Sequence, residues 1–521
     1  MENKFNLIDE PWIPIADYGL ISLRDIFSNN KYRELGGNPI QKIAIFKLLL
    51  AISQAAVTPS DEEAWQALGT EKLAHRCLTY LEKWHDKFYL YGERPFLQMP
   101  KVLESIDERT EKKLKSAKTP AQKRKVMATA APKAFGAGFY PDLPSDNNTL
   151  LSHTLIERDL QDHEKALFIL TLMNFSFGGK RIEADLISLA GQKLGNRHSA
   201  KAGPSLGGFW GYLHSFVMAE GILSSLWLNL LTEQEIKRMG YWTSGLGDPP
   251  WESMPADEAG PDAEKYKNSY MATLIALSRF VLLKGAGIYY LEGIAYPNVR
   301  DGWFEPSLTL DKSGKDIRVK YVDPEKKPWR ELESLLGLAI TGQSTGFECQ
   351  GIKIALERAR DNFSIVSVWS GGLRASSNSG DQSVKQSDDF VESKVWLETA
   401  VLKQAWFDQL KLEMEALNSL SAVLYARVNR YFSDFTVDGK NIAKMATNMF
   451  WHLCERDFQQ LVQNCEATDE AKKQRQRLRR QFANYQHESF DCFCPSQTAR
   501  QIDAWARNRP SNYSYVFQEV S

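Results

Sequence analysis

The stretch Gly203-Pro-Ser-Leu-Gly-Gly-Phe-Trp-Gly211 combines dense glycine with a cationic approach. Between residues 178 and 211 the chain has eight glycines, and interleaved with them are Lys180, Arg181, Lys193, Arg197 and Lys201. Glycine lets backbone amides approach another polymer closely, and cations attract a polyanion by neutralising its phosphates. The segment is therefore either a backbone-lined contact for nucleic acid or a glycine-rich surface connection, and its own residues favour neither.

The sequence carries no clear catalytic or metal-binding motif. Gly337-Leu-Ala-Ile-Thr-Gly-Gln-Ser344 has the glycine spacing of a phosphate-binding loop, but Gln343 stands where a lysine is needed. The nucleophile elbow Gly-x-Ser-x-Gly and the zinc motif His-Glu-x-x-His are absent. The eight histidines and six cysteines lack metal-ligand spacing, so we expect no metal site. A nuclease or hydrolase without a known motif is left as a minor alternative.

Composition limits the partners and the compartment. The 521 residues include 64 basic and 65 acidic side chains, a net charge of −1, so nucleic-acid binding has to come from local patches. The N-terminus lacks the pattern of a signal peptide. The apolar windows 40–57, 166–177 and 271–296 are short or carry charges, so we expect no membrane span. These features predict a cytoplasmic protein with reduced cysteines.

The N-terminal part predicts a mixture of short strands and helices. Residues 5–15 are typical of a strand and turn, a helix over 40–57 begins at Asn38-Pro39, and Ser60-Asp-Glu-Glu opens a second helix. The next region is strongly basic, with Lys112, Lys113, Lys115, Lys118, Lys123, Arg124 and Lys125 ahead of an Ala-, Gly- and Pro-rich stretch. It is either a solvated charged face or a mobile binding loop.

Residues 221–231 form an apolar run, helical or strand-like, that is suited to holding the glycine segment rigid. Strands are predicted over 316–322 and 363–369; in the first, apolar and charged residues alternate at period two, as in a half-exposed strand. The following residues 370–382 are rich in Gly and Ser, and we expect them to break regular structure.

The C-terminal composition is helical. Amphipathic patterns cover about 392–432, 438–466, 468–490 and 497–508, and such helices with brief polar breaks are typical of an up-down bundle. We therefore predict an α+β protein in which a large, mostly helical mixed domain (1–388) precedes a four-helix bundle (389–521). The third helix is basic, and we expect a solvated outer face rather than a phosphate contact for Lys472, Lys473, Arg475, Arg477, Arg479 and Arg480.

Taken in order, several short blocks resemble the large subunit of the type I-E CRISPR Cascade surveillance complex. The opening Phe5-Asn-Leu-Ile-Asp-Glu-Pro-Trp-Ile-Pro-Ile15 and the block Phe88-Tyr-Leu-Tyr-Gly-Glu-Arg-Pro-Phe-Leu-Gln98 are similar to N-terminal signatures of that family. Ala202-Gly-Pro-Ser-Leu-Gly-Gly-Phe209 resembles its glycine loop. Later landmarks are Gly293-Ile-Ala-Tyr-Pro297, Lys327-Pro-Trp329 and Ser370-Gly-Gly-Leu-Arg374. The blocks are collinear over nearly the whole chain, and the family also ends in a four-helix bundle.

The resemblance implies a non-catalytic subunit, without cofactor or zinc, that reads the protospacer-adjacent motif through the minor groove. The groove displays few distinguishing groups, so backbone approach and an inserted wedge would carry the readout. The implied glycine-loop residues are Gly203, Ser205, Leu206, Gly207 and Gly208. The implied lysine finger is Lys284. The implied wedge consists of Arg374, Ala375, Ser376, Ser377 and Asn378, where some relatives carry a glutamine at the tip.

The resemblance also implies partners. A loop over 126–148, with Lys133, Phe135 and Phe139, would contact the crRNA and a neighbouring subunit. The other partners are the remaining Cascade subunits, target double-stranded DNA and a recruited helicase–nuclease. A structural scaffold of another ribonucleoprotein is the main alternative; it would share the bundle but would not need the glycine loop and wedge.

Overall fold

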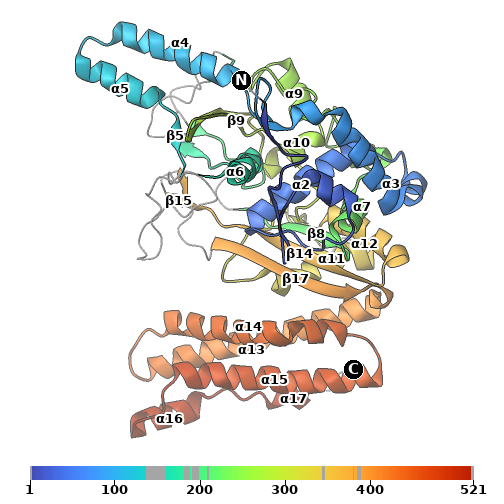
Figure 1. The fold of residues 1–521 in the computed structure, drawn as a ribbon. Coiled ribbons are helices and arrows are strands. Elements are labelled where there is room, and N and C mark those ends of the chain that lie inside the picture. The colour runs from blue at the N-terminus through green and yellow to red at the C-terminus, as the bar shows by residue number, and fades with distance from the viewer. Residues whose placement is uncertain are drawn as a thin grey trace. The chain divides into compact units, whose positions relative to one another are not determined.

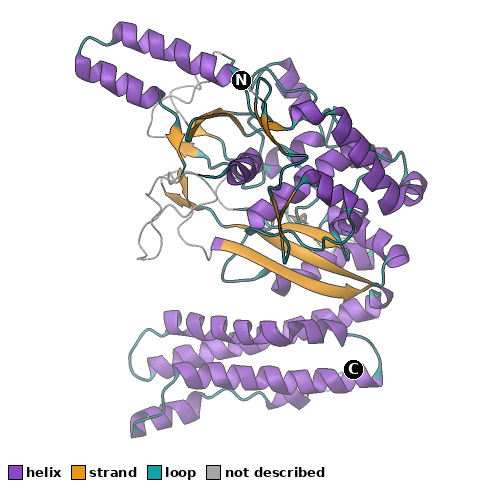
Figure 2. Ribbon diagram, in the orientation of Figure 1, coloured by secondary structure: helices purple, strands orange, loops and turns teal. Residues whose placement is uncertain are grey.

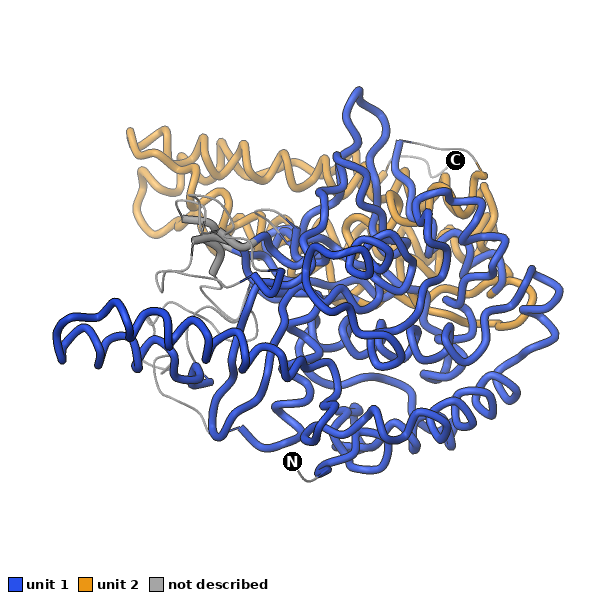
Figure 3. The backbone as a smooth tube through the Cα atoms, turned by 90° about the horizontal axis from the view of Figure 1, so that it is seen from above, with its two compact units in different colours: residues 1–328, 346–358, 369–393 blue, residues 329–345, 359–368, 394–521 orange. Residues whose placement is uncertain are grey.

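The computed structural model describes residues 3–135, 160–180, 188–190, 199–207, 211–342, 346–378, 381–383 and 389–517. Within them the chain forms two compact units, coloured separately in Figure 3. The first unit contains residues 1–328, 346–358 and 369–393, and the second contains 329–345, 359–368 and 394–521. The division is not a single cut in the sequence, because the chain passes between the units within two strands, one α-helix and one 3-10 helix. The domain boundary between 388 and 389 stays a prediction.

The α+β fold class is confirmed, with strands before residue 399 and helices from residue 404 to the end of the described chain (Figures 1 and 2). The helices up to residue 274 are α1 (Leu23–Ser28), α2 (Pro39–Ala56), α3 (Glu62–Lys83), α4 (Lys101–Ser116), α5 (Pro120–Ala130), α6 (Asp162–Phe175), α7 (Ile222–Asn229), α8 (Glu233–Met239), α9 (Pro261–Lys267) and α10 (Met271–Leu274). The later helices are α11 (Leu332–Thr341), α12 (Gln350–Asn362), α13 (Gln404–Ser433), α14 (Lys440–Gln463), α15 (Asp469–Phe493), α16 (Ala499–Asn508) and α17 (Tyr513–Phe517).

The strands form several small sheets. Three sheets have three strands, in the orders β5-β10-β9, β12-β11-β13 and β17-β14-β8, and four have two, β1-β4, β2-β3, β6-β7 and β15-β16. The strands in chain order are β1 (Lys4–Asn6), β2 (Ile13–Ile15), β3 (Gly19–Ile21), β4 (Tyr89–Tyr91), β5 (Lys133–Ala134), β6 (Gly179–Lys180), β7 (Ser199–Ala200), β8 (His214–Met218), β9 (Arg279–Lys284), β10 (Gly287–Glu292), β11 (Leu310–Asp311), β12 (Arg318–Val319), β13 (Phe347–Glu348), β14 (Ile365–Leu373), β15 (Ser376–Asn378), β16 (Asp381–Ser383) and β17 (Phe390–Glu398).

Helix α2 is the central helix of the first unit. The predicted start is confirmed: the Asn38 side chain accepts from the Gln41 amide, and Pro39 occupies the first turn, where its missing N–H costs nothing. The helix packs against α3, α6, α7 and α10. It is the one described helix long and apolar enough to cross a membrane, but 78% of it is buried inside the protein. Its apolar surface is therefore that of a core helix.

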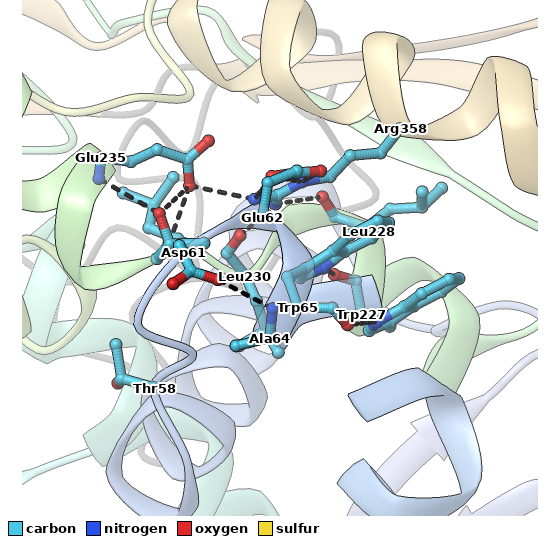
Figure 4. A network of polar contacts seen from close by, with 12 residues as sticks. Thr58, Asp61, Glu62, Ala64, Trp65, Trp227, Leu228, Leu230, Glu235 and Arg358 are labelled. Atoms are coloured by element: carbon cyan, nitrogen blue, oxygen red, sulfur yellow. Dashed lines mark hydrogen bonds and ion pairs between the residues drawn. The ribbon is translucent and has the colours of Figure 1, made fainter. Parts of the chain in front are cut away.

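A buried arginine ties four helices of this unit together (Figure 4). The Arg358 guanidinium on α12 donates to Glu62 of α3 and to Glu235 of α8, at 2.8 and 3.0 Å. It also donates to the Leu230 carbonyl after α7 and lies 4.3 Å from the centre of the Trp65 ring. Trp65 stacks on Trp227 at 4.2 Å, and each indole N–H donates to the other residue's carbonyl. Each buried polar atom named here thus has a partner, as a stable interior requires.

Several predicted elements were wrong in extent. The helix expected from 392 begins at Gln404, because residues 390–398 form β17 beside β14. Residues 370–373 continue β14 instead of breaking it, and 376–378 pair with 381–383 as β15 and β16. The strand expected over 316–322 is reduced to Arg318–Val319.

The loop expected over 126–148 begins later than predicted. Helix α5 continues to Ala130, and β5 takes Lys133 and Ala134. A Thr119–Gln122 capping box with Pro120 in the first turn starts α5, so that three residues separate the two helices and make a tight helical hairpin. The basic run 112–125 is therefore mostly helical, and residues 136–148 of the expected loop lie outside the described residues.

The second unit is dominated by the predicted C-terminal helices. Helices α13, α14 and α15 pack pairwise, α16 packs on α13, and α17 packs on α15. The solvated face predicted for the α15 cations was wrong for Arg475 and Arg479, which lie on the buried side of the helix. Arg479 forms a bidentate pair with Glu413 of α13, with both N···O distances 2.9 Å.

Candidate nucleic-acid interface

The glycine loop (residues 203–207 of the described chain) is held against the end of α6. The Gly203 amide donates to the Ser176 carbonyl at 2.7 Å, and the Leu206 amide donates back to the Gly203 carbonyl at 3.0 Å. Gly207 has φ +79°, a left-handed conformation that glycine adopts without the strain of a Cβ. The side chains of Ser205 and Leu206 are fully buried. Of the predicted loop residues these two act as anchors here; Gly208 lies outside the described residues.

A buried polar cluster (Lys47, Ser205, His214 and Glu305) lies beneath the loop. The Lys47 ammonium lies 2.6 Å from both the Glu305 carboxylate and the Ser205 hydroxyl oxygen. The His214 ring lies 3.2 Å from Glu305 through Nδ1 and 2.9 Å from the Ser205 carbonyl through Nε2. The hydroxyl and the carbonyl of Ser205 thus each have a hydrogen-bond partner in this cluster. The cluster fixes the loop at its middle residue.

Within the cluster, the charged forms of Lys47 and Glu305 stabilise each other in the protein interior. Burial alone would raise the pKa of Glu305, but the charge of Lys47 and the contact with His214 more than offset it and lower that pKa to about 2. Burial lowers the pKa of Lys47, and Glu305 counteracts the shift. Removing either partner would leave an uncompensated charge in the core.

The exit of the glycine loop lies against the root of the wedge. A Cβ added to Gly211 would overlap the carbonyl oxygen of Leu373, and one added to Gly372 would lie 2.6 Å from the carbonyl oxygen of Tyr212. The Gly211 carbonyl also accepts from the Val322 amide at 2.8 Å. Glycine at 211 therefore permits direct backbone packing between two segments more than 150 residues apart in sequence.

The predicted wedge residues lie on and just before a β-hairpin. In this wedge hairpin, β15 pairs antiparallel with β16 in the register Ser376–Ser383, Ser377–Gln382 and Asn378–Asp381. Its base is closed by the Arg374 amide, which donates to the Asp389 carbonyl at 2.8 Å. Arg374 is half-buried and Ala375 is fully buried. Strand β14 leads into this base with buried residues from Val366 onward, so the hairpin has a rigid root.

Lys284 lies at the tip of a second hairpin, the finger hairpin, formed by β9 and β10. Lys284 pairs with Gly287, Gly285 between them has φ +60°, and the Lys284 side chain is exposed. At the base, the buried Arg279 side chain donates to the carbonyls of Phe177 and Lys201, at 2.6 and 2.9 Å. Ser278 also bonds Ser176, with 3.0 Å between the hydroxyl oxygens. The finger hairpin and the glycine loop therefore share one support, residues 176–177 after α6.

Of the residues predicted to contact crRNA, Lys133 lies in a strand that pairs with the finger hairpin. Lys133 and Ala134 form β5, which pairs with Ile288 and Gly287 of β10. The Phe135 ring is buried and packs edge-on against Phe168 of α6 at 5.4 Å. Phe135 thus anchors the segment in this chain. Phe139 lies outside the described residues.

Sequence reasoning missed the supporting residues. Lys47 was hidden in an apolar helix, His214 was considered only as one of eight scattered histidines, and Glu305 was not singled out. The signal available was the placement of a lysine among Ile43, Phe46 and Leu50, where a buried charge needs a distant partner. Among the residues that the structure describes, no group of three or more His, Cys, Asp or Glu is arranged to hold a metal ion.

Comparison with known proteins decides the family. The family described as CRISPR-associated protein Cse1 matches residues 6–488. This chain belongs to the Cse1 family. The resemblance drawn from the sequence is thereby confirmed. The CasA/Cse1 protein of Thermus thermophilus is 33% identical to this Cse1-family chain over 107 residues, which is 18% of this chain and 21% of that relative. The aligned segment thus spans about a fifth of the relative's length.

Solved structures of the family share the fold over almost the whole chain. The crystal structure of Thermus thermophilus CasA superposes with a TM-score of 0.69 and 16% identity, covering 99% of this chain and 100% of that one. Thermobifida fusca Cse1 has a TM-score of 0.69 and 16% identity, covering 99% and 95%. A chain of a CRISPR RNA-guided surveillance complex has a TM-score of 0.65 and 15% identity, covering 97% and 98%.

Proposed function

We propose that this chain is the DNA-recognition subunit of a CRISPR RNA-guided surveillance complex. In this role it binds crRNA and other Cascade subunits in the cytoplasm, reads the protospacer-adjacent motif of target DNA, and helps to recruit a helicase–nuclease. The glycine loop (203–208) and Lys284 contact the minor groove, and the wedge around 374–378 enters the opened duplex. The chain contributes binding and no bond cleavage of its own; metal-dependent cutting of a labelled duplex by the isolated chain would contradict this.

One observation carries the proposal: the exit of the glycine loop packs directly against the root of the wedge, through Gly211 and Leu373. A minor-groove reader that also opens DNA needs a backbone-lined contact and a wedge at a fixed mutual distance, because a kink is made at the base step beside the contact. A scaffold protein has no such requirement. Sequence beyond the motif would be read by guide pairing, so these short elements suffice.

The test uses the assembled complex with Lys284→Ala and Arg374→Ala. Neither side chain is fully buried, so both variants are expected to assemble normally. Lys284→Ala should weaken binding to a target carrying the motif by about 10-fold, the effect of one groove contact. Binding to a target without the motif should not change. An equal loss on both targets would contradict motif reading by this residue.

Arg374→Ala should slow strand opening on linear DNA, followed by 2-aminopurine fluorescence next to the motif, because unpairing costs a few kcal/mol. The defect should shrink on negatively supercoiled DNA, which supplies part of that energy. Identical opening rates for wild type and variant on both DNAs would contradict the wedge assignment.

A further inference from the structure

The cationic hairpin (α4–α5, residues 101–130) projects from the rest of the first unit (Figure 1). Val102 is its one fully buried residue. Its two helices pack on each other, and α4 also packs on β9 and β10. The apolar residues Leu103, Ile106 and Leu114 of α4 are half-buried. Most residues of the cationic hairpin are solvent-exposed.

Charge is segregated along the cationic hairpin. The acidic residues Glu104, Asp107, Glu108 and Glu111 all precede Lys112 in α4, and residues 112–130 contain no acid. Six cations of the distal half are exposed: Lys112, Lys115, Lys118, Lys123, Arg124 and Lys125. Within the part of the chain that the structure describes, none of the six forms an ion pair. A surface charged only for solubility usually intersperses both signs.

Both ends of the cationic hairpin are attached to the finger hairpin. Before α4, the Met99 amide donates to the Val281 carbonyl at 3.0 Å, and the Gln98 side chain accepts from the Leu283 amide at 2.8 Å. After α5, β5 extends the same sheet by pairing with β10. Lys284 and the cationic hairpin are therefore carried by one continuous hydrogen-bonded support.

We infer that the distal half of the cationic hairpin binds the phosphates of duplex DNA that flanks the protospacer-adjacent motif. The inference rests on the proposed function, which places Lys284 at the motif. Helix α4 spans 16 residues, about 24 Å at 1.5 Å per residue. This length corresponds to roughly 7 base pairs of duplex at 3.4 Å each. The cations thus reach DNA well beyond the motif.

The residue types favour duplex DNA over single-stranded RNA. Residues 112–130 contain no Phe, Tyr, Trp or His. Recognition of single strands relies on aromatic platforms that stack bases, whereas a duplex backbone can be bound by cations alone. A rigid arm of lysine and arginine therefore matches a continuous double helix.

The test compares the assembled wild-type complex with a variant in which all six exposed cations are glutamine. The control variant carries glutamine at four exposed cations of α15: Lys472, Lys473, Arg477 and Arg480. Binding is measured over a salt series on targets with the motif and either about 15 or about 3 base pairs of flanking duplex. Each phosphate contact contributes about 0.9 to the slope of log K against log salt.

Wild type and control should bind the long-flank target at least about 10-fold more tightly than the short-flank target, with a slope steeper by about 3 or more. The six-site variant should bind both targets alike, at the wild-type affinity for the short flank. Equal weakening on both targets, failure to co-assemble with crRNA and the other subunits, or no change at all would each overturn the inference. A wild-type complex indifferent to the motif would instead contradict the proposed function.

Discussion

Two basic helical segments of this chain have similar compositions and opposite environments. In α15 the side chains of Arg475 and Arg479 are buried against Glu413, whereas six cations of the distal α4–α5 hairpin are exposed and, among the residues that the structure describes, form no ion pair. Helix α15 packs against α13, α14 and α17, so one of its faces must be internal. The base of the α4–α5 hairpin packs on β9 and β10, but beyond Val102 its side chains are half-buried or exposed. A run of cations therefore becomes part of a buried ion-pair cluster or stays on an exposed surface according to what surrounds it.

The largest effect on the free energy of unfolding is expected from Glu413→Gln, which removes the partner of the two buried arginines of α15. The substitution leaves Arg475 and Arg479 in the interior without their carboxylate, at a cost of about 3–5 kcal/mol in the free energy of unfolding. Chemical unfolding followed by helix content measures it. The control is Glu415→Gln on the same helix, whose exposed carboxylate lies 4.0 Å from Lys411 and contributes little. Equal midpoints for the two variants would refute the assignment.

Lys47→Met tests whether the buried Lys47 charge both stabilises the fold and positions Ser205 of the glycine loop. It leaves the Glu305 carboxylate buried without its ammonium, so we expect a loss of about 3 kcal/mol in the free energy of unfolding. The double variant Lys47→Met, Glu305→Leu should recover part of that stability, because an apolar pair replaces the charges. Binding of motif-bearing DNA should stay weak in both variants, since Ser205 has lost its donor. Recovery of binding together with stability would rule out the positioning role.

The polar cluster also predicts a dependence on pH. The pKa of Glu305 is lowered from 4.5 to about 2 in the folded chain, so the unfolded chain takes up the proton more readily. The stabilisation by this carboxylate is complete above pH 4.5 and is lost as the pH falls through about 2. The difference in unfolding midpoint between wild type and Glu305→Gln should shrink over that window. A difference that stays constant from pH 7 to pH 2 would contradict the pairing.

The smallest effect on stability is expected from the cationic hairpin. Glutamine at its six exposed cations should change the free energy of unfolding by less than about 0.5 kcal/mol, because exposed charges without partners stabilise little. Thermal unfolding of the isolated chain measures it. Glutamine at Arg475 and Arg479 supplies the contrast, since those side chains fill a buried site. If both variants lost a comparable free energy of unfolding, the cations of the hairpin and the buried arginines of α15 would not differ in their contribution to stability.

Much of the fold follows from local patterns in the sequence. The start of α2 at Asn38-Pro39 and the helices that became α14, α15 and α16 were predicted closely, because capping residues and helical periodicity act within a few turns. Errors arose where a distant strand decided the outcome. Residues 390–398 carry a pattern that also suits a helix, but their pairing with β14 makes them a strand.

For the interface, the sequence alone determined which residues deserved attention: the glycine loop, Lys284 and the segment around Arg374. Their arrangement was decided by tertiary contacts. The Gly211–Leu373 packing, the Arg279 bridge to Phe177 and the Lys47–Glu305 pair each join residues that are 100 or more positions apart. Periodicity and spacing report on neighbours within a helix or strand. A buried charge finds its partner, and a glycine the backbone it must approach, only when the chain has folded.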